Sequence, residues 1–303
     1  MFRSPEATQG VSETRVDTTS RPTFRRPEIT VPIGVGMHLL STSMTLVTLE
    51  RRGPIAIITL DRPDIRNAFD HQMAQALGAE LAEVEDDPEL RVAILAATVT
   101  EPRPVFCAGH DLRTIEDERN GCARAETETG GFGGLTQLAR TKPLIAAVDG
   151  LATSGGLELV LSCDLVVATR RSSFELAEVR WGLIAGAGGL FRLPWAIGRA
   201  TAMDMILTGQ PIDAERAYAL GLVSTLTDSD VMSAAIGRAE LIAAHPATGI
   251  TASMFVATQA FSQSEDGLWA ANNTAIDMIM HSDDLTAGLA SFAINGAPRP
   301  TDN

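Results

Sequence analysis

A strand-like segment, a glycine pair and a helix-like segment follow one another between residues 144 and 163. Leu144 to Val148 is apolar, Gly155 and Gly156 come next, and Leu157 to Cys163 reads as a helix. Glycine at such a junction lets another backbone approach closely, and the first N–H groups of the helix have no intrahelical acceptor. Glu158 lies three residues after Gly155, so its carboxylate is expected on the same helical face as that N–H. The junction therefore predicts an anion-stabilising donor next to an acid/base group.

A second glutamate and a further glycine turn accompany this junction. Glu178 lies between Phe174 and a glycine-rich stretch that runs from Gly182 through Gly186-Ala-Gly-Gly189. The other turn, Val105-Phe-Cys-Ala108-Gly-His-Asp-Leu112, precedes both glutamates. Gly186 to Gly189 does not satisfy the G-x-G-x-x-G pattern and follows no suitable strand, so a nicotinamide site is not predicted.

These three blocks, in this order and spacing, resemble the enoyl-CoA hydratase/isomerase (crotonase) superfamily. The resemblance runs from about Met44, through Arg66-Asn-Ala68, to about Ile294. It implies an α/β fold: a crotonase-type spiral of repeated β-β-α units over residues 44–198, and a C-terminal helical region over 199–303. Residues 1–43, rich in Thr, Ser, Pro and Arg, are expected to form a disordered arm.

The resemblance also assigns roles to individual residues. It places the oxyanion hole of an acyl-CoA thioester at the backbone N–H groups of Ala108 and Gly155, because two preorganised donors stabilise a developing enolate. Glu158 is assigned mainly to water activation and Glu178 mainly to proton donation. The residues expected to contact the substrate or its CoA are Arg66, Ala68, Ala108, His110, Asp111, Leu112, Gly155 and Gly186.

Because both glutamates are present, the chain looks most like a two-glutamate enoyl-CoA hydratase. Such a hydro-lyase adds water across the 2,3 double bond of a 2-enoyl-CoA through an enolate. The alternatives are another crotonase reaction, such as isomerisation or dehydration of a different hydroxyacyl-CoA, and a non-catalytic or RNA-binding relative. The resemblance implies no cofactor, since coenzyme A is part of the substrate, and no metal.

Simpler interpretations hold for several residues near these motifs. We expect Glu175 to be a surface carboxylate, His110 to shape its loop and Cys107 to pack in the core. Asp111 is expected to cap or orient local backbone, and Arg66 either to reach the CoA phosphates or to remain solvated. Ser154 stands where the family often has glycine, and we expect this to change loop rigidity more than chemistry.

Composition indicates a cytoplasmic enzyme that binds neither nucleic acid nor membrane. The net charge of -14 disfavours polyanion binding, and no apolar run approaches the ~20 residues that span a bilayer. The three cysteines show no disulfide or metal spacing, as in proteins of a reducing compartment. By resemblance, the partners are the acyl-CoA and copies of this chain in a homotrimer or a dimer of trimers.

Periodicity predicts the following elements. Strands are expected at residues 55–60, 92–97, 144–148, 165–168 and 222–225. Helices are expected at residues 71–84, 201–208, 214–220, 231–244, 251–261, 267–280 and 285–294. Residues 113–140, with Gly130-Gly-Phe-Gly-Gly134, have little apolar pattern and are expected to form a mobile flank of the acyl pocket.

Overall fold

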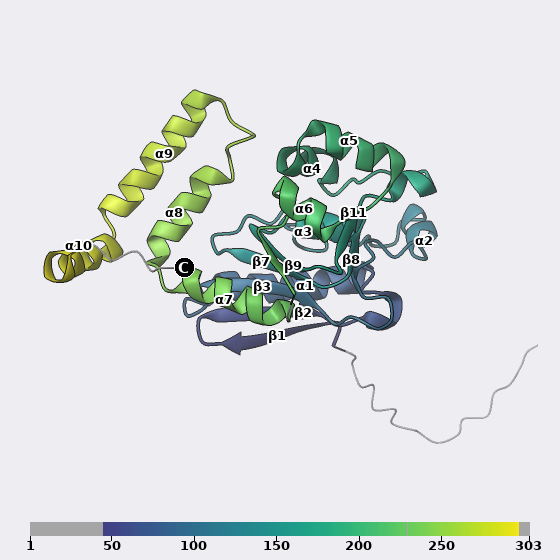
Figure 1. Cartoon of the computed structure of the whole chain (residues 1–303), viewed down its shortest axis with the longest axis horizontal. Helices are drawn as coiled ribbons and strands as arrows, with labels where there is room; N and C mark the ends of the chain where they lie inside the picture. Colours follow the sequence, from purple (N-terminus) through teal and green to yellow (C-terminus); the bar gives the residue numbers. More distant parts are fainter. Residues whose placement is uncertain (1–44, 229, 297–303) are drawn as a thin grey trace, which may run out of the picture. The chain divides into compact units, whose positions relative to one another are not determined.

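The computed structural model describes residues 45–228 and 230–296, so the arm expected at 1–43 lies outside the described part. Its main sheet has six strands in the order β1-β2-β3-β7-β9-β12 (Figure 1). The strands are β1 (Val47–Arg52), β2 (Ile55–Leu60), β3 (Val92–Ala97), β7 (Leu144–Val148), β9 (Leu165–Thr169) and β12 (Thr225–Thr227). Strand β1 pairs antiparallel with β2, and every other neighbouring pair in this sheet is parallel. Strand β7 is buried along its whole length, as expected for a parallel strand with both faces covered.

Short strands that follow the long ones build a second sheet in the order β11-β10-β8-β4. These strands are β4 (Val105–Cys107), β8 (Leu151–Thr153), β10 (Ser173–Glu175) and β11 (Ile212–Asp213). Along the chain, β3 leads to β4 and helix α2 (Ile115–Arg119), β7 to β8 and α3 (Gly155–Val160), and β9 to β10 and, after a 3-10 turn, α4 (Gly189–Ile197). This repeat is the predicted spiral of β-β-α units, and it places α3 beside β4 and β8 of the short sheet.

Helices cover the main sheet on both faces. On one face, α1 (His71–Asp86) packs Met73, Leu77 and Leu81 against the apolar side chains of the sheet. On the other, α7 (Val231–Ala243) covers alternate residues of the same strands with Ala235, Ile236 and Ala239 (Figure 1). The alternation of side chains along each strand thus supplies two separate cores.

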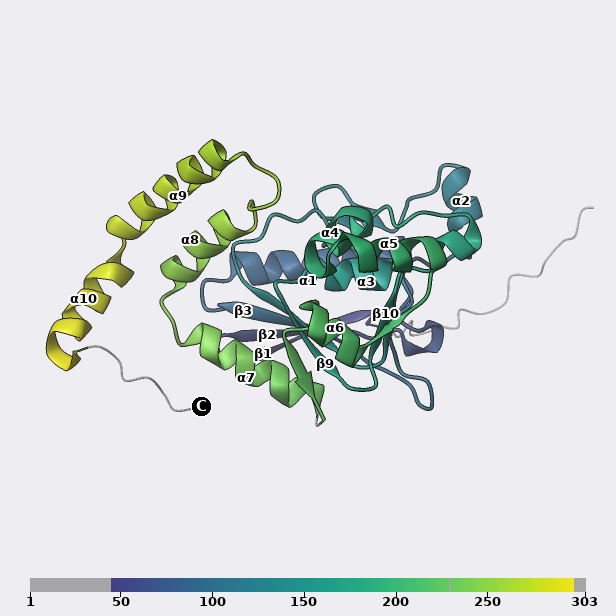
Figure 2. The same cartoon turned by 45° about the horizontal axis from the view of Figure 1, so that its top comes forward.

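The remaining helical elements connect and extend this layered body. They are the 3-10 turns η1 (Pro63–Ile65) and η2 (Glu178–Trp181), and the helices α5 (Arg199–Thr208), α6 (Ala214–Leu220), α8 (Ala247–Ala257), α9 (Glu265–Met280) and α10 (Asp283–Asn295). Helices α8 and α9 lie side by side in both views (Figures 1 and 2). No helix in the described ranges is long and apolar enough to cross a bilayer.

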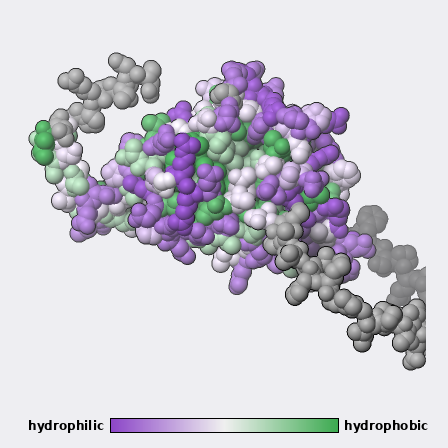
Figure 3. Space-filling view, turned by 90° about the horizontal axis from the view of Figure 1, so that it is seen from below, coloured by the Kyte–Doolittle hydropathy of each residue, from purple (hydrophilic) through white to green (hydrophobic). Residues whose placement is uncertain are grey.

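The C-terminal helices leave large apolar side chains exposed. Trp269, Leu289 and Phe292 are all more than half exposed. The face of the molecule shown in Figure 3 carries hydrophobic patches among a largely hydrophilic surface. Such patches are compatible with association between copies of the chain, which stays a prediction.

Most predicted elements are confirmed. The strands expected at 55–60, 92–97 and 144–148 and the helix at 214–220 have the observed bounds. Two predictions are displaced by two to four residues at their ends. The strand expected at 222–225 is β12 at 225–227, because Leu222 and Val223 are buried in the turn after α6 without pairing in the sheet. The helix expected at 251–261 is α8 at 247–257, which begins directly after Pro246.

The prediction that the glycine-rich segment at 130–134 forms a mobile flank of the acyl pocket is wrong. Residues 130–136 are all buried. They include β6 (Gly131–Phe132), which pairs with β5 (Glu126–Thr127) in a two-stranded antiparallel sheet. A Cβ on Gly134 would lie 2.7 Å from the Cα of Gly78 in α1. The glycines here serve close backbone packing, which lets Phe132 reach the start of α3.

We predict that Gly134→Ala destabilises the protein far more than Gly53→Ala. Both glycines have positive φ, +71° and +58°, but a Cβ on Gly53 would meet nothing within 4 Å. Gly53→Ala therefore reports the backbone cost alone, about 1–2 kcal/mol. Gly134→Ala should cost at least ~2 kcal/mol more in denaturant unfolding because it forces α1 away. Equal costs would contradict the close packing of this segment.

Candidate active site

Two glycine turns from different repeats are in direct contact at the site. A Cβ on Gly109, after β4, would lie 2.7 Å from the backbone N of Gly155, the first residue of α3. A Cβ on Gly156 would lie 2.2 Å from the carbonyl oxygen of Cys107. On the other side of Gly155, a Cβ would meet the ring of Phe132 at 2.6 Å. The start of α3 is thus held between the β4 turn and the buried glycine-rich segment.

The turn after β4 does not offer the amide that the sequence predicted. The Ala108 N–H donates to the carbonyl oxygen of Arg66 at 2.9 Å, so it already has an acceptor inside the protein. Phe69 forms a parallel β-bridge with His110 in this turn. The Phe69 N–H donates to the carbonyl oxygen of Gly109, and the Asp111 N–H donates to the carbonyl oxygen of Phe69, both at 2.8 Å. The His110 N–H between them is therefore turned the other way. Neither it nor the Gly155 N–H has an acceptor among the described residues.

Glu158 is a buried carboxylate held by the loop before α4. Its Oε1 accepts hydrogen bonds from the backbone N–H groups of Ala187 at 2.7 Å and Gly189 at 2.8 Å. A Cβ on Gly189 would lie 3.1 Å from that oxygen, so glycine permits the approach. Both of these donors bind Oε1, which leaves Oε2 of Glu158 available to a ligand. Sequence reasoning missed these two donors, although glycines directly before a helix are a signal for anion binding.

Arg192 is a further residue that sequence reasoning missed. Its guanidinium donates to the carbonyl oxygen of Thr136 at 2.6 Å and to the Ser162 hydroxyl at 3.1 Å. It also donates to the carbonyl oxygen of Ala187 at 3.3 Å, so it braces the loop that holds Glu158. Burial raises the pKa of Glu158, and the two backbone donors and the charge of Arg192 oppose that rise.

Glu178, at the start of η2, has a less polar environment. Burial, with the nearby charges of Glu158 and Glu175, raises its pKa to about 7, against the opposing hydrogen bonds of its own backbone and of Ser154. Its Oε2 is buried without a hydrogen-bond partner among the described residues. The two carboxyls are coupled, and the bonds at Glu158 favour its ionised form. Glu158 therefore has local support for its ionised form, whereas Glu178 changes protonation state near neutral pH.

The other predicted contact residues lie around the two turns with different exposure. Arg66 and Leu112 are exposed, as is Gly186 in the loop before α4. Ala68 is buried. Asp111 is also buried, and its carboxylate accepts both the backbone N–H and the guanidinium of Arg113, which confirms its expected local role.

Cys107 and His110 were predicted to have structural roles and Glu175 to lie at the surface; the first two predictions hold. Cys107 is fully buried, and burial raises its pKa to about 12, so it packs as expected. The His110 ring lies 2.8 Å from Glu118 Oε1 and packs on Phe132, which fits a loop-shaping role for the side chain. Glu175 was expected at the surface, but it is buried because its carboxylate accepts the Thr153 hydroxyl at 2.9 Å and pairs with Arg180.

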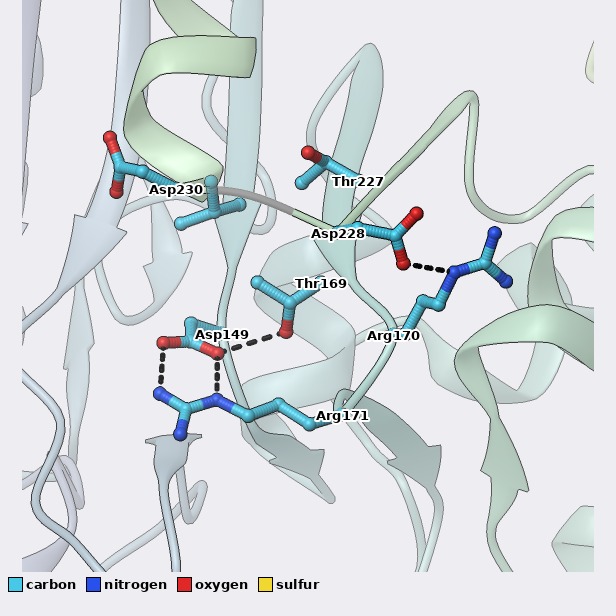
Figure 4. Close-up of a pocket in the computed structure, with 8 residues that line it drawn as sticks. Asp149, Thr169, Arg170, Arg171, Thr227, Asp228 and Asp230 are labelled. Atoms are coloured by element: carbon cyan, nitrogen blue, oxygen red, sulfur yellow. Dashed lines mark hydrogen bonds and ion pairs between the residues drawn. The ribbon is translucent and has the colours of Figure 1, made fainter.

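A cavity of about 400 Å³ lies elsewhere, where β7, β9 and β12 end (Figure 4). It is lined by Asp149, Thr169, Arg170, Arg171, Thr227, Asp228, Asp230 and Val231. Arg170 pairs with Asp228 and Glu215, and Arg171 pairs with Asp149 and Glu101. Because each guanidinium is already paired with two carboxylates, we interpret the charged residues of this cavity as a structural ion-pair cluster.

Comparison with known proteins identifies the family to which the chain belongs. The sequence model of the enoyl-CoA hydratase/isomerase family matches residues 50–302. The chain belongs to this family. A carnitinyl-CoA dehydratase from Salmonella typhi is 34% identical over 82% of this chain and 96% of its own length.

Solved structures of the family share the fold. An enoyl-CoA hydratase from Mycobacterium tuberculosis H37Rv superposes with a TM-score of 0.77, at 38% identity, over 86% of this chain and 100% of that one. A carnitinyl-CoA hydratase from Mycobacterium avium gives a TM-score of 0.66 at 36% identity, over 86% and 100%. The predicted crotonase-type fold is thereby confirmed.

We predict that Glu178→Gln stabilises the folded protein above neutral pH. The folded pKa of about 7 lies above the ordinary value of 4.5. The contribution of Glu178 to the free energy of unfolding is therefore present in full below pH 4.5, where the carboxyl is protonated in both states. It is lost as the pH rises through 7. Urea unfolding at pH 8 should show a gain on the order of 1–2 kcal/mol, allowing for solvent screening, and almost none at pH 4.5. A gain independent of pH would contradict the shifted pKa.

Proposed function

We propose that this chain is a hydro-lyase that acts on CoA thioesters. It adds water across the double bond of a 2-enoyl-CoA to give a 3-hydroxyacyl-CoA and catalyses the reverse dehydration. The observation that carries the proposal is the position of two buried carboxyls, Glu158 and Glu178, next to two backbone N–H groups without acceptors. Family membership and the names of the relatives support it.

The first requirement of the reaction is to stabilise an oxyanion. When water adds to C3, the electrons of the double bond move onto the thioester oxygen as an enolate. We assign the two donors to the N–H groups of His110 and Gly155, in place of the predicted pair Ala108 and Gly155. A donor placed where the oxyanion forms typically contributes a factor of about 10²–10³ in rate.

The second requirement is to move two protons in opposite senses. Ionised Glu158 takes a proton from the water as its oxygen bonds to C3. Protonated Glu178 gives its proton to C2, so that H and OH add across the former double bond. A pKa of about 7 suits Glu178, because the same group must accept a proton from C2 in dehydration. The two carboxyls then exchange protons with solvent before the next turnover.

A more specific candidate is dehydration of carnitinyl-CoA. The relatives that favour it are the dehydratase from Salmonella typhi and the hydratase from Mycobacterium avium named above. Its acyl group carries a quaternary ammonium, unlike that of a simple fatty acyl-CoA. Comparing kcat/KM for carnitinyl-CoA with that for straight-chain 3-hydroxyacyl-CoAs of increasing length separates the two substrates.

We predict that Glu158→Gln and Glu178→Gln each lower the rate of hydration by at least ~10², because each removes a positioned acid/base group. Glu175→Gln is the matched control, since it removes a buried carboxylate nearby that pairs with Arg180 instead of facing the two amides. Its rate should fall less than tenfold. Near-normal turnover in either of the first two variants would remove the two-glutamate mechanism.

A separate prediction concerns the CoA nucleotide. Arg66 is exposed, and its side chain has no hydrogen bond or ion pair to a described residue, whereas Arg62 is paired with Asp70. If Arg66 anchors a phosphate, Arg66→Ala should raise KM for a CoA thioester several-fold with a smaller effect on kcat, since the contact is remote from the reacting carbons. A truncated thioester without the nucleotide should be nearly unaffected. Equal effects on both substrates would show that Arg66 shapes its loop.

A further inference from the structure

Arg192, in α4, is a half-buried cation with no carboxylate partner among the described residues. A charge that leaves water is usually paired with an opposite charge. Arg140, a neighbouring arginine, follows this rule, because it pairs with Asp164 at 2.8 Å. An arginine without such a pair beside a candidate active site calls for a physical reason.

The guanidinium of Arg192 bonds oxygens from three different segments. It donates to the carbonyl oxygen of Thr136, to the hydroxyl of Ser162 just after α3, and to the carbonyl oxygen of Ala187 in the loop before α4. The Ser162 hydroxyl in turn donates to the backbone carbonyl oxygen of Glu158 at 2.8 Å. Arg192 therefore ties this loop to the helix that carries Glu158.

The loop before α4 contacts both the guanidinium and the Glu158 carboxylate. The Ala187 N–H donates to Oε1 of Glu158, while the Ala187 carbonyl oxygen accepts from Arg192. Gly188 has a φ of +108°, and a Cβ on it would overlap Nη1 of Arg192. A Cβ on Gly189 would lie 3.1 Å from Oε1 of Glu158. Displacement of the guanidinium would therefore displace the loop that holds the carboxylate.

We propose that Arg192 is a positioning residue for Glu158: its guanidinium fixes the loop whose amides hold Oε1, and its charge favours the ionised carboxylate that takes a proton from water. The inference rests on the base role proposed for Glu158. It also accounts for the lack of an ion pair to Arg192 in the described part of the chain, since a second carboxylate on the guanidinium would neutralise this charge.

The charges around Glu158 define the effect of removing Arg192. Glu178, from η2, is the carboxyl coupled to Glu158, and Arg140 is the cation that acts on Arg192. The Arg140 charge is paired with Asp164. Burial raises the pKa of Glu158, and the two loop amides and the charge of Arg192 oppose the rise. Without Arg192, Glu158 should remain protonated to higher pH.

Three variants of the full-length chain separate this role from a purely structural one. Arg192→Met removes the charge and the three bonds, whereas Arg192→Lys keeps the charge and loses the planar fork. Arg140→Met is the matched control. Arg140 bonds the carbonyl oxygen of the same Ser162, but its other bonds in the described chain go to Lys142 and Asp164 instead of the loop.

The titration of Glu158 is followed by ¹³C NMR of carboxyl-labelled glutamate in a Glu178→Gln background, which removes the coupled carboxyl. The Glu158 signal is assigned through Glu158→Gln. Its midpoint should rise by about one pH unit or more in Arg192→Met and by about half a unit in Arg192→Lys. Arg140→Met should shift it by less than about 0.3 units, even where it lowers the melting temperature.

Kinetics with Glu178 intact give a second readout. Arg192→Met should lower kcat for hydration at least ~10-fold and change KM less than about threefold, because Arg192 acts on Glu158 and not on the substrate. The acid limb of the pH–rate profile should move up with the NMR midpoint, since the base must be ionised.

An unchanged Glu158 midpoint in Arg192→Met, or an equal rise in Arg140→Met, would overturn the proposal. If Arg192→Met did not fold, an unchanged midpoint in Arg192→Lys would overturn it. The titration needs no substrate, so it decides the role of Arg192 separately from catalysis. Absence of hydration by the wild-type chain on any 2-enoyl-CoA would count instead against the proposed function.

Discussion

The site depends on a backbone contact between Gly109 and Gly155, residues from two different repeats of the fold. No side chain fits between them, since a Cβ on Gly109 would lie 2.7 Å from the Gly155 nitrogen. The contact brings together an amide at the end of a short strand and an amide at the start of a helix. Because Glu158 lies on the first turn of that helix, its carboxylate is fixed relative to both amides. The β-β-α repeat makes this possible: β4, β8 and β10 run parallel, so the turns that follow them lie at the same end of the short sheet.

The two glutamates differ because their neighbours differ. Glu158 receives two backbone donors from a glycine loop that Arg192 braces, so its ionised form is supported inside the protein. Glu178 is buried beside two other carboxylates, which favours its protonated form up to about pH 7. In the proposed mechanism, this difference in environment gives the two identical side chains opposite tasks in proton transfer. In that mechanism the loop before α4 contributes by holding Glu158 through its backbone, although its side chains are small.

The sequence motifs predicted which segments and which two glutamates come together in the candidate site, because glycines at strand ends constrain the chain locally. They did not predict which amide of the turn after β4 is free. That depends on the bridge between Phe69 and His110, a contact across 41 residues that leaves no local pattern. The burial of Glu175 and of residues 130–136 was missed for the same reason: each results from partners distant in sequence. The positive φ of Ser154, 54°, likewise accompanies a backbone bond to Glu175, which is distant in the sequence.

The measurement that tests the central claim most directly is a crystal structure of the protein with a bound 3-hydroxyacyl-CoA. The account predicts that the thioester oxygen lies about 2.7–3.1 Å from the backbone nitrogens of His110 and Gly155. The C3 hydroxyl should lie within hydrogen-bonding distance of Glu158, with C2 facing Glu178. A thioester oxygen bound by the Ala108 N–H, or an acyl group bound away from both glutamates, would contradict the account.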